Sequence, residues 1–217
     1  MTPFEIKDCT LLVRMSGLPP AVNLRELRDR VAACGPNVIY HHFCETPLRP
    51  TFDNPDYRND FAVWVKSYLG DRVLAERLGA VDPYAFESLE ELRAATLDLV
   101  DERLSESTVV PWARPGDEFS FQEATSIVFD TGERIGHPRD LAAAIRKMTN
   151  GSIYYHFLDA RWRPIHGLDD FSTWMLEEEE ANRHYLRALG SIDFYFHSLI
   201  HLRRDILRAL EEADPPA

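Results

Sequence analysis

Six pairs of polar side chains with chemical potential occur in this sequence, each pair in matching surroundings. Imidazole, carboxylate and guanidinium groups are the side chains that bind metal ions, transfer protons and hold polar ligands. Any chemistry performed by this chain should therefore involve some of these residues. The pairs are Tyr40 and Tyr154, His42 and His156, Arg49 and Arg163, Asp60 and Asp170, Asp82 and Asp193, and Arg93 and Arg203.

The surroundings of these residues indicate a tandem duplication. Ile39-Tyr40-His41-His42-Phe43 returns as Ile153-Tyr154-Tyr155-His156-Phe157, at a spacing of 153 − 39 = 114. Matches in several blocks, in one order and at nearly one offset, are typical of an internal repeat. Further matches join Asp60-Phe61-x-x-Trp64 with Asp170-Phe171-x-x-Trp174, Leu78-Gly79 with Leu189-Gly190, and Leu89-x-x-Leu92-Arg93 with Leu199-x-x-Leu202-Arg203.

Each repeat is predicted to be one strand followed by several helices. Residues 4–15 and 119–130 are rich in aromatic and β-branched side chains, which favours extended structure. We therefore predict an α+β, predominantly helical fold with a pseudo-two-fold arrangement. The predicted boundaries are 1–104 for the first repeat, 105–118 for a Pro-rich crossover and 119–217 for the second repeat, with one compact core shared by both.

Local signals place the helices. Asn23-Leu24-Arg25-Glu26 and Ser88-Leu89-Glu90-Glu91 have the spacing of capping boxes, each followed by apolar residues at helical intervals. The two blocks that contain the histidines are predicted as helices. Asp60 and Asp170 are expected to cap the helices that carry Trp64 and Trp174.

Two further segments carry weaker expectations. Trp112, within the crossover, is expected to pack against one of the repeats. The acidic run 177–180 is expected to form a solvated helical face.

Composition excludes some partners. The chain has 217 residues and a formal net charge of −12, and no segment combines Lys and Arg with exposed aromatic residues. This is unlike a nucleic-acid-binding protein. The sequence shows neither a signal peptide nor an apolar run long enough to cross a bilayer, so a cytoplasmic location is predicted. Cys9, Cys34 and Cys44 are replaced by apolar residues in the second repeat, which indicates that they serve as small hydrophobic side chains.

Several repeated motifs resemble a widespread prokaryotic family of unknown function. The resemblance extends over nearly the whole chain and includes the crossover. It implies no activity, catalytic residue or cofactor, so function has to be argued from the residues. The motifs are Asn23-Leu24-Arg25-Glu26-Leu27, Ile39-Tyr40-His41-His42-Phe43, Asn59-Asp60-Phe61-Ala62-x-Trp64, Leu74-Ala75-Glu76-Arg77-Leu78 and Val110-Pro111-Trp112-Ala113-Arg114-Pro115.

The preferred interpretation is a non-catalytic module that binds a polar small molecule, such as a sugar or a phosphorylated metabolite, or a protein partner. Tyrosine, histidine and arginine side chains supply contact area and hydrogen bonds to such a ligand. His41 is matched by Tyr155, and Arg161 by Pro47, so these positions are predicted to make the cleft asymmetric. No metal or cofactor is predicted. The candidate ligand-binding residues are Tyr40, His41, His42, Tyr154, His156 and Arg161.

Two alternatives remain open at this stage. The histidines are suited to a structural role as hydrogen-bonded core residues. Alternatively, convergence of His42, His156, Asp60 and Asp170 at the repeat interface would suit a divalent metal and a hydrolase. No His-Glu-x-x-His, Gly-x-Ser-x-Gly or phosphate-binding glycine loop is present to decide between them. Whether the protein is an enzyme is not decided by its sequence.

Overall fold

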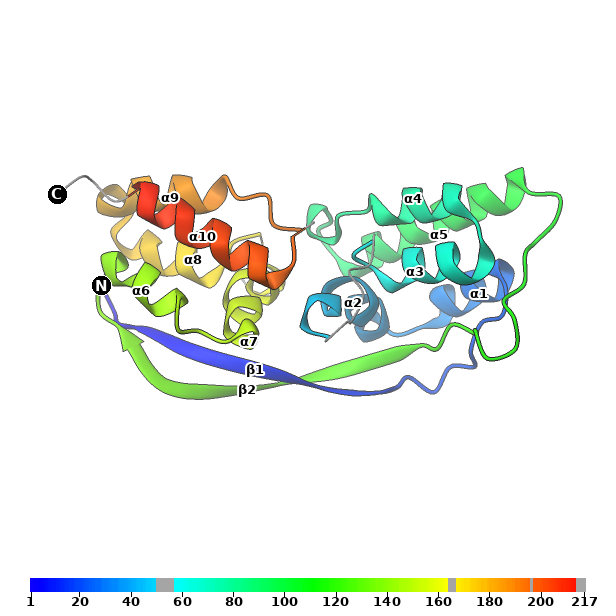
Figure 1. Ribbon diagram of the computed structural model, residues 1–217, viewed down its shortest axis with the longest axis horizontal. Helices are drawn as coiled ribbons and strands as arrows, with labels where there is room; N and C mark the ends of the chain where they lie inside the picture. Colours follow the sequence, from blue (N-terminus) through cyan, green and yellow to red (C-terminus); the bar gives the residue numbers. More distant parts are fainter. Residues whose placement is uncertain (50–56, 164–166, 196, 214–217) are drawn as a thin grey trace. The chain divides into compact units, whose positions relative to one another are not determined.

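The computed structural model describes residues 1–49, 57–163, 167–195 and 197–213. It is mostly helical with one two-stranded antiparallel sheet, which confirms the predicted α+β, predominantly helical class (Figure 1). The chain divides into two compact units. We call residues 12–125 unit A, and residues 1–11 with 126–217 unit B. None of the described helices combines the length and the apolar character needed to cross a membrane.

The sheet consists of β1 (Phe4–Met15) and β2 (Gln122–Ile135). Thr131 Oγ1 donates to the carbonyl of Ile6 (2.7 Å), which links the two strands through a side chain. Both strands contribute to both units, because the division falls after Leu11 and after Thr125. The predicted repeats 1–104 and 119–217 each contain one whole strand, whereas each strand is divided between the two compact units.

Unit A contains the helices of the first half of the chain. α1 begins with the predicted capping box: Asn23 Oδ1 accepts from Glu26 N (3.0 Å), and Glu26 Oε2 accepts from Val22 N (3.2 Å). Ser88 and Glu91 form a similar box at the start of α5. The elements are α1 (Leu24–Ala33), α2 (Pro36–Cys44), η1 (Thr46–Leu48), α3 (Asp60–Trp64), η2 (Val65–Leu69), α4 (Arg72–Gly79), η3 (Pro83–Ala85) and α5 (Leu89–Glu106).

Unit B contains the helices of the second half, and its histidine block forms a π-helical turn. His156 lies within this turn, so both histidine blocks are helical as predicted. The elements are η4 (Pro138–Asp140), α6 (Leu141–Ile145), α7 (Asn150–Ile153), η5 (Tyr154–Leu158), η6 (Asp159–Trp162), α8 (Asp170–Met175), η7 (Leu176–Glu178), α9 (Glu179–Gly190) and α10 (Leu199–Ala213).

Apolar residues that match between the two halves of the sequence are buried in their units. The large aromatic side chains at these positions retain at most 6% of their exposure. The three cysteines are buried, in line with a hydrophobic role. The matched buried pairs are Phe43 and Phe157, Phe61 and Phe171, Trp64 and Trp174, and Leu92 and Leu202.

Three local predictions need correction. Asn59 and Asp169 cap α3 and α8 with their side chains, whereas Asp60 and Asp170 are the first helical residues and turn their carboxylates elsewhere. Trp112 is 67% exposed and does not pack into a core. It forms an isolated bridge with Asn23 through the backbone, which leaves its ring in solvent.

The acidic run is exposed as predicted, but two of its carboxylates have specific partners. Glu178 accepts from the amino group of Met1 (3.0 Å), and Glu177 accepts from Thr2 N (2.7 Å). The amino group of Met1 and the backbone N–H of Thr2 therefore offset part of the repulsion between these adjacent carboxylates.

The glycines that end α4 and α9 give the first prediction. A Cβ on Gly79 would lie 2.3 Å from the Tyr57 ring, whereas a Cβ on Gly190 would meet nothing within 4 Å. We expect Gly79→Ala to lower the free energy of unfolding by about 1–3 kcal/mol because the Tyr57 ring must move. Gly190→Ala should leave it unchanged or raise it by up to ~1 kcal/mol. Urea unfolding measures both, and equal effects would contradict the close packing of Tyr57 on α4.

Candidate functional site

His42 in unit A has both ring nitrogens engaged. Its Nδ1 lies 2.6 Å from Asp60 Oδ2, and its Nε2 accepts from the backbone N–H of Gln122 (3.0 Å). Because Nε2 accepts, the proton of the neutral ring resides on Nδ1 and is donated to Asp60. The same Asp60 oxygen accepts from the Arg49 guanidinium (2.7 Å). His42 therefore joins a strand backbone to an Asp–Arg pair.

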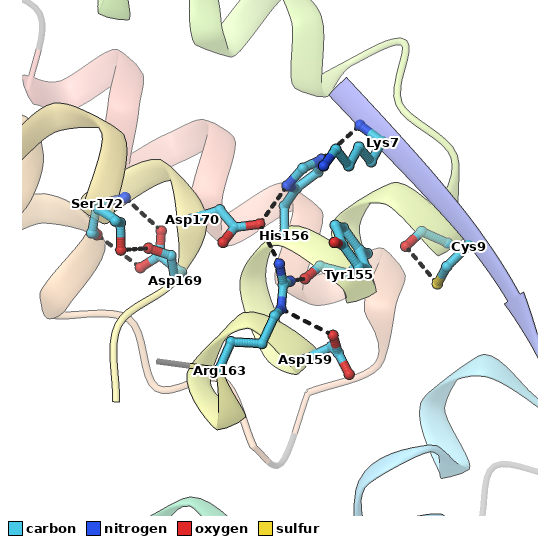
Figure 2. Close-up of polar contacts among 11 residues, drawn as sticks. Lys7, Cys9, Tyr155, His156, Asp159, Arg163, Asp169, Asp170 and Ser172 are labelled. Carbon is cyan, nitrogen blue, oxygen red and sulfur yellow. Dashed lines mark hydrogen bonds and ion pairs between the residues drawn. The ribbon is translucent and has the colours of Figure 1, made fainter. Parts of the chain in front are cut away.

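His156 in unit B has the same pattern with different partners. Figure 2 shows its ring between the strand and Asp170: Nε2 accepts from Lys7 N (2.9 Å), and Nδ1 lies 2.7 Å from Asp170 Oδ2. Arg163 donates to the same carboxylate oxygen (3.2 Å) and also to the carbonyl of Tyr155. Each unit thus contains one His–Asp–Arg cluster.

A tryptophan holds the same strand segment at a second point in each unit. Trp64 Nε1 donates to the carbonyl of Asp117 (2.7 Å), and Trp174 Nε1 donates to the carbonyl of Thr2 (2.6 Å). Between these contacts and the histidine contacts, a phenylalanine of the segment packs into the core. We call these segments, 2–7 in unit B and 117–122 in unit A, the anchored segments.

The buried phenylalanines show which helices each anchored segment meets. Phe4, from the first half of the sequence, packs on the rings of His156 (4.9 Å between centroids) and Trp174 (5.3 Å) in unit B. Phe119, from the second half, packs on His42 (4.9 Å) in unit A. The anchored segment from each half of the sequence therefore belongs to the unit formed by the helices of the other half.

Burial and charge act in opposite directions on the cluster in unit A. Burial lowers the pKa of His42 by more than the neighbouring Asp60 carboxylate raises it. Burial alone would raise the pKa of Asp60, but hydrogen bonds and charge from His42 and Arg49 outweigh it and hold that pKa below its ordinary value. His42 is therefore neutral near pH 7, as its accepted hydrogen bond requires, while Asp60 is ionised.

A pH dependence follows from the lowered pKa of His42. In the unfolded chain His42 has the ordinary histidine pKa of about 6.5, which is above its pKa in the folded protein. The contribution of neutral His42 to stability is therefore complete above about pH 6.5 and is lost as the pH falls below that value. Protonation of Asp60 should remove more stability only below about pH 4. We expect the loss of stability caused by His42→Gln to be smaller at pH 5.5 than at pH 7.5 in urea unfolding. His201→Gln, at an exposed histidine, serves as the control. A larger loss at pH 5.5 would contradict the lowered pKa.

Each cluster forms part of the wall of an open cavity. The cavity in unit B has a volume of about 320 Å³ and the one in unit A about 210 Å³. Several corresponding positions line both cavities, so the two occupy equivalent places in their units. The shared lining pairs are His156 and His42, Arg163 and Arg49, Asp170 and Asp60, Trp174 and Trp64, Phe4 and Phe119, and Lys7 and Gln122.

The two cavities differ in how their arginines are supported. In unit B the Arg163 guanidinium lies over the Tyr155 ring (4.0 Å to the centroid), and its Nε is 3.2 Å from Asp159 Oδ2. In unit A the residue that matches Tyr155 is His41, which is fully buried with its Nδ1 2.6 Å from buried Glu45. The predicted asymmetry at His41 thus changes the support of the arginine, and His41 itself lines neither cavity.

The structure places only part of the predicted ligand-binding set at these cavities. His42 and His156 line them, but Tyr40, Tyr154 and Arg161 do not. Tyr154 is fully buried. The Arg161 guanidinium lies over the Phe194 ring (4.1 Å), and its Nε donates to the carbonyl of Phe157 (3.0 Å), so it stabilises a chain turn instead.

The predicted ligand-binding set leaves out the residues that complete each cluster. Arg49 and Arg163 were in the repeated polar set, and their offset of 114 from each other was the available signal. Lys7 and Gln122 contribute through backbone N–H groups, which no side-chain pattern reveals. Among the described residues, no group of three or more His, Cys, Asp or Glu side chains is placed to hold a metal ion.

Comparison with known proteins identifies the family but no activity. Residues 1–211 match the model of a family of unknown function (DUF5752), so the chain belongs to this family. The chain is also similar to a solved structure titled "The structure of OrfY from Thermoproteus tenax", from an archaeon, with 29% identity and a TM-score of 0.81. That match covers 98% of this chain and 96% of the other. No curated protein matched the chain.

Proposed function

We propose that this member of the DUF5752 family is a non-catalytic protein that binds a small polar molecule in the cavity of unit B. The observation that carries the proposal is an open cavity of about 320 Å³ with the exposed edges of Arg163 and Asp170 in its wall. Their side chains are 31% and 27% exposed, so both can exchange water for a ligand. The volume is at the lower end of the range for ligand sites.

The hydrogen bonds of His156 support binding without catalysis. A general base needs a lone pair within hydrogen-bond reach of the proton it removes. In His156 the only lone pair on the neutral ring accepts from the Lys7 backbone, and the other nitrogen donates to Asp170. Acting on a substrate would require the anchored segment to detach first.

The charges of the cavity favour an overall uncharged ligand. Lys7 and Arg163 face three carboxylates, those of Glu5, Asp170 and Glu177. Such a lining attracts neither anions nor cations strongly, but it offers donors and acceptors side by side. A polyhydroxylated molecule about the size of a monosaccharide matches this combination.

The alternative of a metal-dependent hydrolase is less well supported. It requires free imidazole nitrogens as ligands, whereas both nitrogens of His42 and of His156 have partners inside their own units. We also infer that the two His–Asp–Arg clusters descend from one duplicated ancestor, since matched residues make matched contacts. The pseudo-two-fold arrangement and the cytoplasmic location stay predictions.

The binding proposal is tested with monosaccharides as probes. Glucose, mannose and galactose, each at millimolar concentration, should raise the melting temperature of the wild-type protein if one of them binds the folded state. Lys7→Ala should weaken that binding about tenfold or more in calorimetry, because Lys7 lines the cavity. Arg187→Gln, at an exposed position of α9 outside this cavity, should bind like wild type.

Two outcomes would reject the proposal. One is that none of the three sugars, nor sorbitol or inositol as open and cyclic polyols, changes the melting temperature. The other is that a sugar binds but Lys7→Ala and Arg187→Gln bind it equally well. Binding of inorganic phosphate in place of the sugars, abolished by Lys7→Ala, would replace the uncharged ligand with an anion.

A further inference from the structure

A second and larger cavity in unit B lies beside α9, apart from the two His–Asp–Arg clusters. Its volume is about 820 Å³, which is within the range of sites that hold metabolite-sized ligands. Its wall combines the segment after β2 with one face of α9. The titratable groups that line it are Met1, His137, Arg139, Glu178, His184 and Tyr185.

Basic groups predominate in this cavity, although the protein as a whole carries a net charge of −12. Arg139 is permanently charged, and His137 and His184 are the two imidazoles of the lining. The one carboxylate, Glu178, is already paired with the amino group of Met1 at 3.0 Å. The unpaired charge of the cavity is therefore positive, which contrasts with the balanced cavity at Arg163.

The basic side chains are available to a ligand. Arg139, His137 and His184 are exposed. In the part of the chain that the structure describes, neither the Arg139 guanidinium nor the His184 imidazole makes a hydrogen bond or an ion pair. By contrast, Asn182 and Tyr185 on the same face of α9 are each only 5% exposed and form a firm base. Free donors above a packed base are the ordinary arrangement of a ligand site.

We propose that this cavity binds a small-molecule anion that carries phosphate or carboxylate groups. The Arg139 guanidinium presents a planar set of donors that matches either group with two parallel hydrogen bonds. The imidazoles of His137 and His184 add donors from the two sides of the cavity, one from each wall element. The ligand and the residues differ from those of the proposed function, so this inference does not rest on it.

The test uses the full chain with two probes that separate the sources of negative charge. Inorganic pyrophosphate represents the phosphate source and citrate the carboxylate source, both titrated calorimetrically in low-salt buffer. We expect one of them to bind, and we expect Arg139→Gln and His184→Gln each to weaken that binding about tenfold. The control is Arg187→Gln, which removes the same charge from exposed α9 surface outside the cavity and should change affinity less than twofold.

The melting temperature of every variant establishes that it is folded, and the substituted positions are exposed. Binding of pyrophosphate alone or citrate alone identifies the charged group, and either supports the site. Failure of both anions to bind would overturn the proposal. So would an equal loss of affinity in Arg139→Gln and Arg187→Gln, because it would show that only the overall charge matters.

Discussion

Replacing Trp64 with alanine is expected to lower the free energy of unfolding by about 3–5 kcal/mol. The indole is 4% exposed, packs edge-on against the Phe119 ring (5.6 Å between centroids), and donates to the carbonyl of Asp117. Alanine would leave a cavity beside Phe119 and would remove the donor for that carbonyl. Chemical denaturation followed by circular dichroism measures the change.

Two tryptophans serve as matched comparisons. Trp174→Ala should cost a similar amount, because Trp174 makes the equivalent contacts with Phe4 and Thr2. Trp112→Ala should change stability by no more than about 0.5 kcal/mol, because its ring is 67% exposed. If Trp64→Ala and Trp112→Ala had the same effect, Trp64 would not anchor the strand.

Replacing His156 with leucine is expected to cost about 2–4 kcal/mol, because two polar groups lose their partner. The N–H of Lys7 would have no acceptor, and Asp170 would lose a donor that lies at 2.7 Å. Leucine has a volume similar to that of histidine but neither donates nor accepts a hydrogen bond, so the loss of stability reports the missing hydrogen bonds rather than a cavity. Urea unfolding at pH 7.5 gives the value.

The matched control is His201→Leu, which places the same substitution at an exposed helical position and should change stability by no more than about 0.5 kcal/mol. His156→Gln should be milder than His156→Leu, since its amide oxygen is able to accept from Lys7. A His156→Leu protein as stable as wild type would show that the strand does not depend on the imidazole.

The elements of this fold were predictable because their signals are local. A capping box such as Ser88 to Glu91 needs only four residues in order, and the structure confirms it. Apolar spacing likewise located the helices that carry Trp64 and Trp174. Helix existence depends on near neighbours in the sequence, so a single sequence contains enough information.

The clusters were not predictable in the same way, because they depend on contacts between distant residues. His42 meets a backbone N–H at Gln122, and nothing in either local sequence specifies the other. Asp60 looked like a helix cap because it precedes an apolar helix, but Asn59 takes that role and frees the carboxylate for His42. Because the N-cap lies one residue earlier than predicted, at Asn59, the Asp60 carboxylate is a hydrogen-bond partner of His42.

A difference between matched residues of the two halves marks a difference between the two units, but it does not show what each residue contacts. His41 differs from its match Tyr155: the Tyr155 ring lies against the Arg163 guanidinium, whereas His41 pairs with buried Glu45. The sequence could not show that His41 turns toward buried Glu45. The surroundings of Arg161 are also not visible in its local sequence, because its guanidinium lies over the rings of Phe157 and Phe194, which are far apart in the chain.

The protonation of His42 and His156 is the most direct test of the central claim, that each imidazole is a fixed link between a strand and an Asp–Arg pair. Long-range ¹H–¹⁵N NMR spectra of uniformly ¹⁵N-labelled protein distinguish the two neutral tautomers, and His42→Gln and His156→Gln identify the signals. At pH 7.5 both rings should carry their proton on Nδ1 and leave Nε2 unprotonated, because Nε2 accepts from Gln122 and Lys7. A proton on Nε2 of either ring would contradict the account.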